Sequence, residues 1–287
     1  MSYSSFEVTN LFSVKGKVVV VTGGGTGIGR AITTALAING AKVYIIGRRL
    51  ETLQNTADEL STAASKNDGQ VIPLQGDILT KEGIHAVSEH LIKIVDKVDY
   101  LINNAGVGTN YKIQAEKVRS KNALEKKLGS IETSDFTDMA TNYISAPWQL
   151  SIALLPLLRK SKDPVITNIS SLAALITKPD IIHPAYGSAK AGESHLTRLL
   201  AANLIPFKIR VNSLSPGIFK SQATTGSSDP NTPVVSFLDS FVKSFPAGRE
   251  GTWEELAGIA LLLATPAGAH VNGIDIVIDG GAKLVFA

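Results

Sequence analysis

The stretch from Lys17 to Arg49, KVVVVTGGGTGIGRAITTALAINGAKVYIIGRR, decides the fold class that we predict for this chain. It opens with an apolar, β-branched run over 17–22, which is too short for a helix and suits a strand buried on both faces. A glycine-rich turn follows at 23–29, and the next residues have the rhythm of a helix that Gly40 ends. A second apolar strand over 41–46 completes a right-handed βαβ unit with parallel strands.

The same alternation continues beyond this unit. The pattern predicts further helices over 50–65, 81–96, 134–160, 186–204 and 253–264, and further strands over 70–75, 98–103, 164–169, 209–213 and 274–278. No change in composition marks a linker. We therefore expect an α/β protein with a single-domain Rossmann fold over residues 1–287, in which helices flank a doubly wound, seven-stranded parallel sheet.

Two segments interrupt this alternation. The first, over 107–133, is long and charged; we interpret it as an insertion, and a solvated, mobile loop is an equally acceptable interpretation. The second begins near 214 and is rich in Ser, Thr, Gly and Pro, so we expect a substrate-binding loop or lid region over 214–250. Both segments follow a predicted strand at the edge where an open parallel sheet binds its ligand.

The composition excludes several classes of protein. None of the 287 residues is cysteine, which excludes thiol nucleophiles, disulfides and cysteine-based metal sites. The 28 basic and 25 acidic side chains leave a net charge of +3, too small to indicate a nucleic-acid partner. We find no run of roughly 18 apolar residues and no secretory signal. We expect a cytoplasmic protein that binds neither membrane nor nucleic acid, and no metal site, because the histidines lack a spacing suited to shared ligation.

The glycine-rich turn has the character of a pyrophosphate-binding loop. It reads Thr22-Gly23-x-x-x-Gly27-x-Gly29, a spacing that differs from G-x-G-x-x-G. Glycines permit a backbone path closed to other residues and let a phosphate approach the N–H groups at a helix N-terminus. Because this turn joins a buried strand to a helix, it predicts a dinucleotide site rather than merely a tight turn.

The end of the second strand indicates which dinucleotide is bound. An NAD site has an acidic residue about 20 positions after the turn, which binds the ribose 2′-hydroxyl. Gly47 takes that place here, and Arg48 and Arg49 follow. A guanidinium binds a phosphate through two parallel hydrogen bonds, so the sequence favours NADP(H), with Arg48 the better candidate. Arg49 can equally be an exposed residue at the start of a helix.

A tyrosine and a lysine share one face of a predicted helix. Tyr186 and Lys190 are four residues apart, which directs both side chains into the same cleft. A phenol with a pKa of about 10 is a poor acid–base group at neutral pH, but a neighbouring cation favours its ionised form. Ser171 lies at the end of a predicted strand, where its hydroxyl can polarise the same substrate oxygen. Together these groups predict proton exchange with a carbonyl oxygen while a nicotinamide carries the hydride.

Further motifs lie at the same edge of the predicted sheet. Asn103-Asn104-Ala105-Gly106 ends the fourth strand, Asp77 follows the third, and Pro216-Gly217-Ile218 follows the sixth. With these motifs and Asp279-Gly280-Gly281, the chain resembles the short-chain dehydrogenase/reductase family over about residues 12–283. Within the family it is most similar to NADP(H)-dependent 3-oxoacyl-carrier-protein reductases and fungal carbonyl reductases.

The resemblance implies a role for each matching residue. Tyr186 would be the general acid/base, Ser171 the hydroxyl that orients the substrate, and Lys190 the ligand of the nicotinamide ribose. Asn142 matches the asparagine that holds a relay water, but the chain is one residue longer after it than in the family, so Tyr143 is an alternative. The residues implied for the cofactor are Gly23, Thr26, Gly27, Ile28, Gly29, Arg48, Arg49, Asp77, Ile78, Asn104, Ala105, Gly106, Tyr186, Lys190, Pro216, Gly217, Ile218 and, in place of the family's threonine, Ser221.

These observations predict an NADPH-dependent oxidoreductase that reduces a ketone or oxidises the corresponding secondary alcohol. One alternative is an isomerase, cyclase or dehydratase of a biosynthetic pathway without net redox change. Another is a non-catalytic NADP(H)-binding regulator, against which the presence of both Tyr186 and Lys190 argues. The family implies a homodimer or homotetramer, whereas the identity of the small-molecule substrate does not follow from the sequence.

Overall fold

A seven-stranded sheet lies at the centre of the computed structural model, which describes residues 3–107, 120–179, 181–227 and 232–286. All neighbouring strands pair in parallel, in the order β3-β2-β1-β4-β5-β6-β7. The strands are β1 (Val18–Thr22), β2 (Lys42–Gly47), β3 (Gln70–Gln75), β4 (Tyr100–Asn103), β5 (Val165–Ile169), β6 (Arg210–Pro216) and β7 (Asp275–Ile278). The predicted fold class is confirmed, and the order of the strands reverses between β1 and β4, where such sheets form a crevice.

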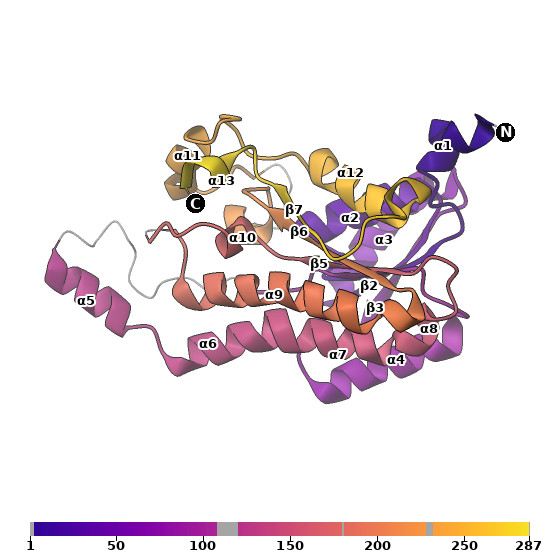
Figure 1. Ribbon diagram of the computed structural model, residues 1–287, viewed down its shortest axis with the longest axis horizontal. Coiled ribbons are helices and arrows are strands. Elements are labelled where there is room, and N and C mark those ends of the chain that lie inside the picture. The colour runs from indigo at the N-terminus through magenta and orange to yellow at the C-terminus, as the bar shows by residue number, and fades with distance from the viewer. Residues whose placement is uncertain (1–2, 108–119, 180, 228–231, 287) are drawn as a thin grey trace.

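Helices cover both faces of this sheet (Figure 1). One layer contains α2 (Gly27–Ile38), α3 (Leu50–Ser65) and α12 (Trp253–Ala264), and the other contains α4 (Lys81–Ile94), α7 (Ala146–Ala153) and α9 (Pro184–Asn203). Successive residues of β1 face opposite layers: Val19 and Val21 join the core with α2, whereas Val20 joins the core with α9. Because both faces are buried, the strand is apolar throughout rather than alternating.

The remaining helical segments are short. They are α1 (Val8–Leu11), α5 (Lys121–Gly129), α6 (Thr133–Ala140), a π-helix (Thr141–Ser145), α8 (Leu155–Leu158), α10 (Gln222–Thr225), α11 (Ser236–Lys243), α13 (Ala282–Phe286), and 3₁₀ turns over Tyr3–Phe6, Leu172–Ala174, Ile205–Phe207 and Pro266–Gly268. The helix predicted over 134–160 is therefore divided, by the π-helix and by Pro156, which lacks a backbone N–H. Among the helices described here, none is both long and apolar enough to cross a lipid bilayer.

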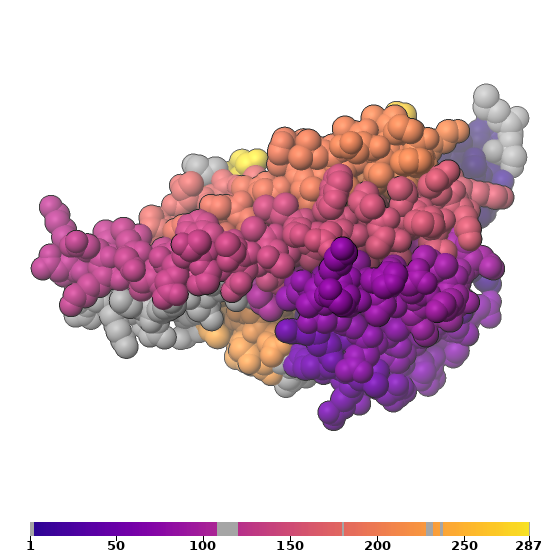
Figure 2. Space-filling model, turned by 90° about the horizontal axis from the view of Figure 1, so that it is seen from below, coloured from indigo at the N-terminus to yellow at the C-terminus, as the bar shows by residue number. Residues whose placement is uncertain are grey.

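Both segments that interrupt the predicted alternation contain helix. In the segment over 107–133, residues 108–119 lie outside the described chain, and α5 forms most of the rest. Ser120 caps α5 by accepting a hydrogen bond from the Ala123 N–H, and the helix projects with α6 from one end of the molecule (Figures 1 and 2). The region over 214–250 contains the end of β6, α10 and α11, with residues 228–231 not described.

The helix α11 forms a small separate core beside the carboxyl edge of the sheet. Its Leu238 and Phe241 are buried, and the Phe241 ring lies 5.0 Å from that of Phe286 in α13. This packing gives part of the predicted 214–250 region a defined structure. The proposed action of that region as a lid stays a prediction.

Candidate active site

A cleft of about 750 Å³ lies at the carboxyl edge of the sheet, beside the reversal between β1 and β4. Turns that follow six of the strands line it, together with the π-helix and the first turns of α9. The structure brings all the predicted catalytic and cofactor-binding residues to this one cleft: Asn142, Ser171, Tyr186, Lys190, Gly23, Thr26, Gly27, Ile28, Gly29, Arg48, Arg49, Asp77, Ile78, Asn104, Ala105, Gly106, Pro216, Gly217, Ile218 and Ser221. Their individual roles remain predictions.

The glycine-rich turn forms a cradle at the N-terminus of α2. Gly23 and Gly27 have φ angles of +65° and +52°, which other residues rarely adopt. A Cβ atom on Gly29 would lie 2.2 Å from the Gly23 carbonyl oxygen, so only glycine allows the helix to begin this close to β1. Thr26, the N-cap, makes no side-chain capping hydrogen bond, which leaves this helix end open to an anion. The cradle therefore fits a pyrophosphate group.

Replacing Gly29 with Ala is expected to lower the free energy of unfolding by about 1–3 kcal/mol, because the new methyl group collides with backbone that cannot move aside. Gly258→Ala is the matched control, since Gly258 is exposed in α12 and an added Cβ meets nothing within 4 Å. The control should raise stability by up to about 1 kcal/mol. Urea denaturation of both variants measures the difference, and a Gly29→Ala variant as stable as the wild type would contradict the close approach.

The two arginines after β2 differ in their surroundings. Both are exposed and both line the cleft. The Nη2 of Arg49 donates to Oε1 of Gln222 at 3.4 Å, which links α3 to α10. Arg48 accepts a hydrogen bond from Gln75 through its main-chain carbonyl, but its guanidinium has no hydrogen bond or ion pair with any described residue. Arg48 is thus the arginine whose side chain is available to an anionic ligand.

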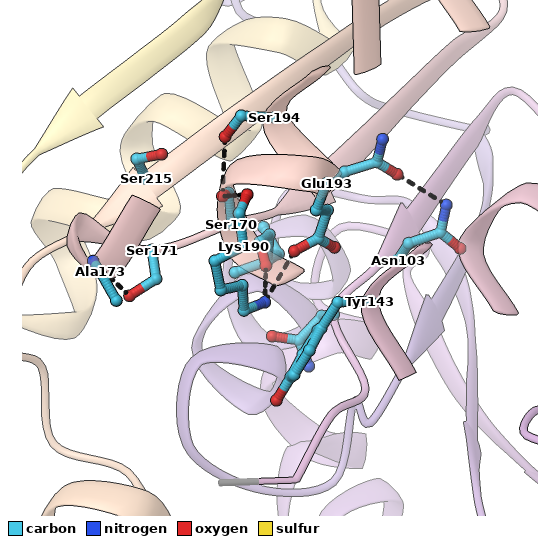
Figure 3. Close-up of polar contacts among 12 residues, drawn as sticks. Asn103, Tyr143, Ser170, Ser171, Ala173, Lys190, Glu193, Ser194 and Ser215 are labelled. Carbon is cyan, nitrogen blue, oxygen red and sulfur yellow. Dashed lines mark hydrogen bonds and ion pairs between the residues drawn. The ribbon is translucent and has the colours of Figure 1, made fainter. Parts of the chain in front are cut away.

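The two serines after β5 also differ (Figure 3). The buried Ser170 hydroxyl donates to the Lys190 carbonyl oxygen at 3.0 Å and lies 2.8 Å from the Ser194 Oγ. The half-buried Ser171 lines the cleft, and its Oγ accepts a hydrogen bond from the Ala173 N–H at 3.1 Å. Because that contact uses only a lone pair, the Ser171 O–H is still able to donate. The arrangement supports Ser171, rather than Ser170, as the substrate-facing hydroxyl.

The Lys190 ammonium is held by three contacts (Figure 3). It donates to the Ile169 carbonyl oxygen at 2.7 Å and to Oε2 of Glu193 at 2.8 Å, and it lies 3.6 Å from the centre of the Tyr143 ring. The centre of the Tyr186 ring is 5.9 Å from the same nitrogen. Tyr186 also lies in the first turn of α9, whose N-terminus favours nearby negative charge. The Tyr186 ring therefore lies close to both the helix end and the Lys190 ammonium.

The π-helix decides which side chain lies beside Lys190. A π turn accommodates one residue more than an α turn, and the Ala146 N–H accordingly bonds the Thr141 carbonyl. Tyr143 thereby lies against both Lys190 and Tyr186: its ring meets that of Tyr186 edge-on at 5.6 Å. Asn142 lines the cleft too, but its amide donates to the Asp138 carbonyl, and its buried Oδ1 has no partner among the described residues. The π turn thus lies where the sequence left both Asn142 and Tyr143 as candidates for the asparagine position, and which of the two fills it stays a prediction.

Burial changes the ionisation of two groups that contact Lys190. The Glu193 side chain is 2% exposed, and burial raises its pKa to about 7 although Lys190 pulls it down. Burial also raises the pKa of Tyr143, whose hydroxyl donates to the Val107 carbonyl oxygen at 2.5 Å. Tyr143 is therefore a neutral phenol with a fixed hydrogen bond, which leaves Tyr186 as the tyrosine suited to acid–base work.

The part of the cleft near α11 and the turn after β5 is predominantly apolar. Its described lining residues include Leu172, Ala173, Ile176, Ile181, Ile182, Ile218, Leu238 and Phe241. His183 is a polar exception; its Nδ1 accepts from the Ala185 N–H at 3.3 Å, and burial lowers its pKa, so the ring is neutral. Such a lining suits the apolar part of a small molecule.

Glu193 was not among the predicted site residues. It stands three positions after Lys190 on a helix, and that spacing places the two on one face. Helical periodicity could therefore have indicated that Lys190 and Glu193 form a pair. Its burial, however, does not follow from this spacing.

Comparison with known proteins finds relatives of this chain over most of its length. The family model for short chain dehydrogenases matches residues 17–232. The short-chain dehydrogenase/reductase PhomF of Diaporthe leptostromiformis is 36% identical over 286 residues, which cover 96% of this chain and 94% of PhomF.

Two solved structures share the fold. Pseudomonas aeruginosa RhlG, in an active-site complex with NADP, has a TM-score of 0.80 and 31% identity, covering 95% of this chain and 98% of RhlG. The 7α-hydroxysteroid dehydrogenase complexed with NADH and 7-oxo-glycochenodeoxycholic acid also has a TM-score of 0.80, with 27% identity and coverage of 96% and 97%. The two complexes contain different nicotinamide cofactors.

Proposed function

This chain belongs to the short-chain dehydrogenase/reductase family, and from that premise we propose that it is an NADPH-dependent enzyme that reduces a ketone, or oxidises the corresponding secondary alcohol. The observation that carries the proposal is the convergence of Ser171, Tyr186 and Lys190 on the cleft that also contains the glycine cradle. A screen of uncharged ketones for NADPH oxidation tests it. An enzyme that converts its substrate without consuming NADPH would instead favour an isomerase, cyclase or dehydratase.

The proposed mechanism assigns one task to each residue. Ser171 donates a hydrogen bond to the carbonyl oxygen and polarises it, and the Tyr186 hydroxyl gives that oxygen a proton. Lys190, together with the N-terminus of α9, stabilises the phenolate that Tyr186 leaves behind. The nicotinamide, when bound, supplies the hydride to the carbonyl carbon. In alcohol oxidation the same groups act in reverse, and Tyr186 accepts the proton.

The residues of the cleft suit a phosphorylated dinucleotide. The cradle around Gly23, Gly27 and Gly29 would hold the pyrophosphate, and the guanidinium of Arg48, which bonds no residue in the described part of the chain, would bind the 2′-phosphate. The NADP complex of RhlG supports this choice, although the related 7α-hydroxysteroid dehydrogenase was complexed with NADH. The cytoplasmic location and the homo-oligomeric state remain predictions.

Replacing Arg48 with Ala is expected to raise the Kd for NADPH by about 10-fold to 100-fold, because a charge-assisted hydrogen bond to the 2′-phosphate is lost. The Kd for NADH, which lacks that phosphate, should change by less than about twofold. Titration of the fluorescence of each bound cofactor measures both constants. Arg49→Ala is the control: Arg49 already bonds Gln222, so its removal should weaken NADPH binding less. Equal weakening of NADPH and NADH in Arg48→Ala would refute the assignment.

A further inference from the structure

The contacts of Lys190 differ from those of a lone cation in a cleft. The Lys190 ammonium has three close neighbours: it donates to the Ile169 carbonyl oxygen and to the Glu193 carboxylate, and it lies over the face of the Tyr143 ring. The Lys190 side chain is 5% exposed and that of Glu193 is 2% exposed, so water does not screen the pair. Lys190 therefore acts on its surroundings as one half of a buried ion pair.

An ion pair stabilises a third charge less than a single cation does. The carboxylate 2.8 Å from the Lys190 ammonium cancels part of the field that this ammonium exerts on Tyr186. In a dry environment that partial cancellation is substantial, because the dielectric constant is low. The stability of the Tyr186 phenolate thus depends on the charge of Glu193.

We propose that Glu193 is a positioning residue that holds the Lys190 ammonium beneath the Tyr143 ring and limits how strongly that ammonium stabilises the Tyr186 phenolate. The proposal rests on the proposed function, because it assumes that Tyr186 is the acid–base group. Glu193 touches neither substrate nor cofactor in this view and acts only through Lys190.

Whether Glu193 is ionised depends on the charged and titratable groups around it. They are Lys190 on α9, Tyr143 on the π-helix and Asp275 on β7, whose carboxylate also accepts hydrogen bonds from Ser194 and Ser215. With a pKa of about 7, Glu193 is ionised throughout the alkaline range in which phenols titrate. Its charge is therefore fully present when Tyr186 loses its proton.

Glu193→Gln tests the proposal, because the amide oxygen can still accept from Lys190 while the charge is removed. Ultraviolet absorbance of tyrosinate is titrated in the free enzyme, and the Tyr186 signal is isolated by subtracting the same background carrying Tyr186→Phe. The midpoint for Tyr186 should fall by about one pH unit, as expected on removal of a nearby like charge. The acid limb of alcohol oxidation should shift in the same direction. A midpoint that rises or does not move would overturn the proposal.

Ser194→Ala provides the matched control. Ser194 is the next residue of α9 and is also buried, but it bonds Ser170 and Asp275 rather than Lys190. Its replacement should leave the Tyr186 midpoint in place, and a shift equal to that of Glu193→Gln would show a general packing effect and overturn the proposal. If the Gln variant does not fold, Glu193→Leu removes the same charge with an apolar side chain and should shift the midpoint in the same direction.

The titration also separates the two proposals. It needs neither cofactor nor substrate, so it reports on Glu193 even if no ketone is reduced. An active Tyr186→Phe enzyme would refute the acid–base role of Tyr186 while leaving the coupling of Glu193 to Lys190 measurable. If Tyr186→Phe loses activity as expected, but the Tyr186 midpoint does not shift in Glu193→Gln, only the role of Glu193 is refuted.

Discussion

Replacing Tyr186 with Phe lowers kcat for ketone reduction by about 10²-fold to 10⁴-fold, the range expected on removing a general acid. The ring that packs in the cleft is kept, and only the proton donor disappears. No described residue forms a hydrogen bond with the Tyr186 hydroxyl, so the variant should unfold at nearly the wild-type temperature. Steady-state kinetics with NADPH, together with a thermal melt, separate lost chemistry from lost structure.

Tyr143→Phe is the control for this experiment. Tyr143 lies in the same cleft, but its hydroxyl is bound to the Val107 carbonyl and its raised pKa keeps it neutral. The variant should lose about 1 kcal/mol of stability with its hydrogen bond and should retain most of its activity, since the ring above Lys190 remains. If Tyr143→Phe were the inactive variant and Tyr186→Phe the active one, the acid–base assignment would be reversed.

Replacing Lys190 with Met is expected to have the largest effect on stability. It leaves the buried Glu193 carboxyl without its cation, and breaking such a pair costs about 3–5 kcal/mol. Activity should fall as well, because the phenolate of Tyr186 loses a stabilising charge. Urea denaturation gives the free energy of unfolding of the variant and of the wild type.

The size of this loss depends on pH. Burial raises the pKa of folded Glu193 from 4.5 to about 7, so its contribution to stability is fully present below about pH 4.5 and is lost as the pH rises through 7. Without Lys190, which lowers this pKa, the pKa rises further and the loss continues into the alkaline range. The gap between wild type and Lys190→Met should therefore widen above pH 7, by up to about 1.4 kcal/mol per pH unit.

The double variant Lys190→Met, Glu193→Gln is the control for the pair. It removes both charges, so no uncompensated carboxylate stays buried, and it should recover most of the stability that the single variant lost. Its free energy of unfolding should also not fall further behind that of the wild type as the pH rises above 7. A double variant as unstable as Lys190→Met at alkaline pH would show that the loss comes from packing rather than from charge.

Much of the fold and the site was predictable because it rests on local patterns. A β-branched run, a glycine turn and an apolar helical rhythm each act within a few residues, and all seven strands and the parallel sheet followed from them. The site residues were predictable for the same reason: in a parallel sheet the carboxyl ends of the strands share one edge, so Ser171, Asn104 and Pro216 had to meet.

The directions of side chains and the packing of distant segments could not be predicted from local patterns. The sequence left Asn142 and Tyr143 as alternatives, and only the structure, with its π-helix, showed that the Tyr143 ring covers Lys190. The chain has Glu193 three residues from Lys190, yet the burial that raises the Glu193 pKa depends on the packed fold, in which the nearby charge of Asp275 raises this pKa further. Periodicity determines which face a residue occupies, whereas burial and charge depend on everything packed against that face. Local patterns in the chain were therefore enough to predict where the candidate site residues meet, whereas the burial and the contacts of Lys190 follow from the packing of distant segments.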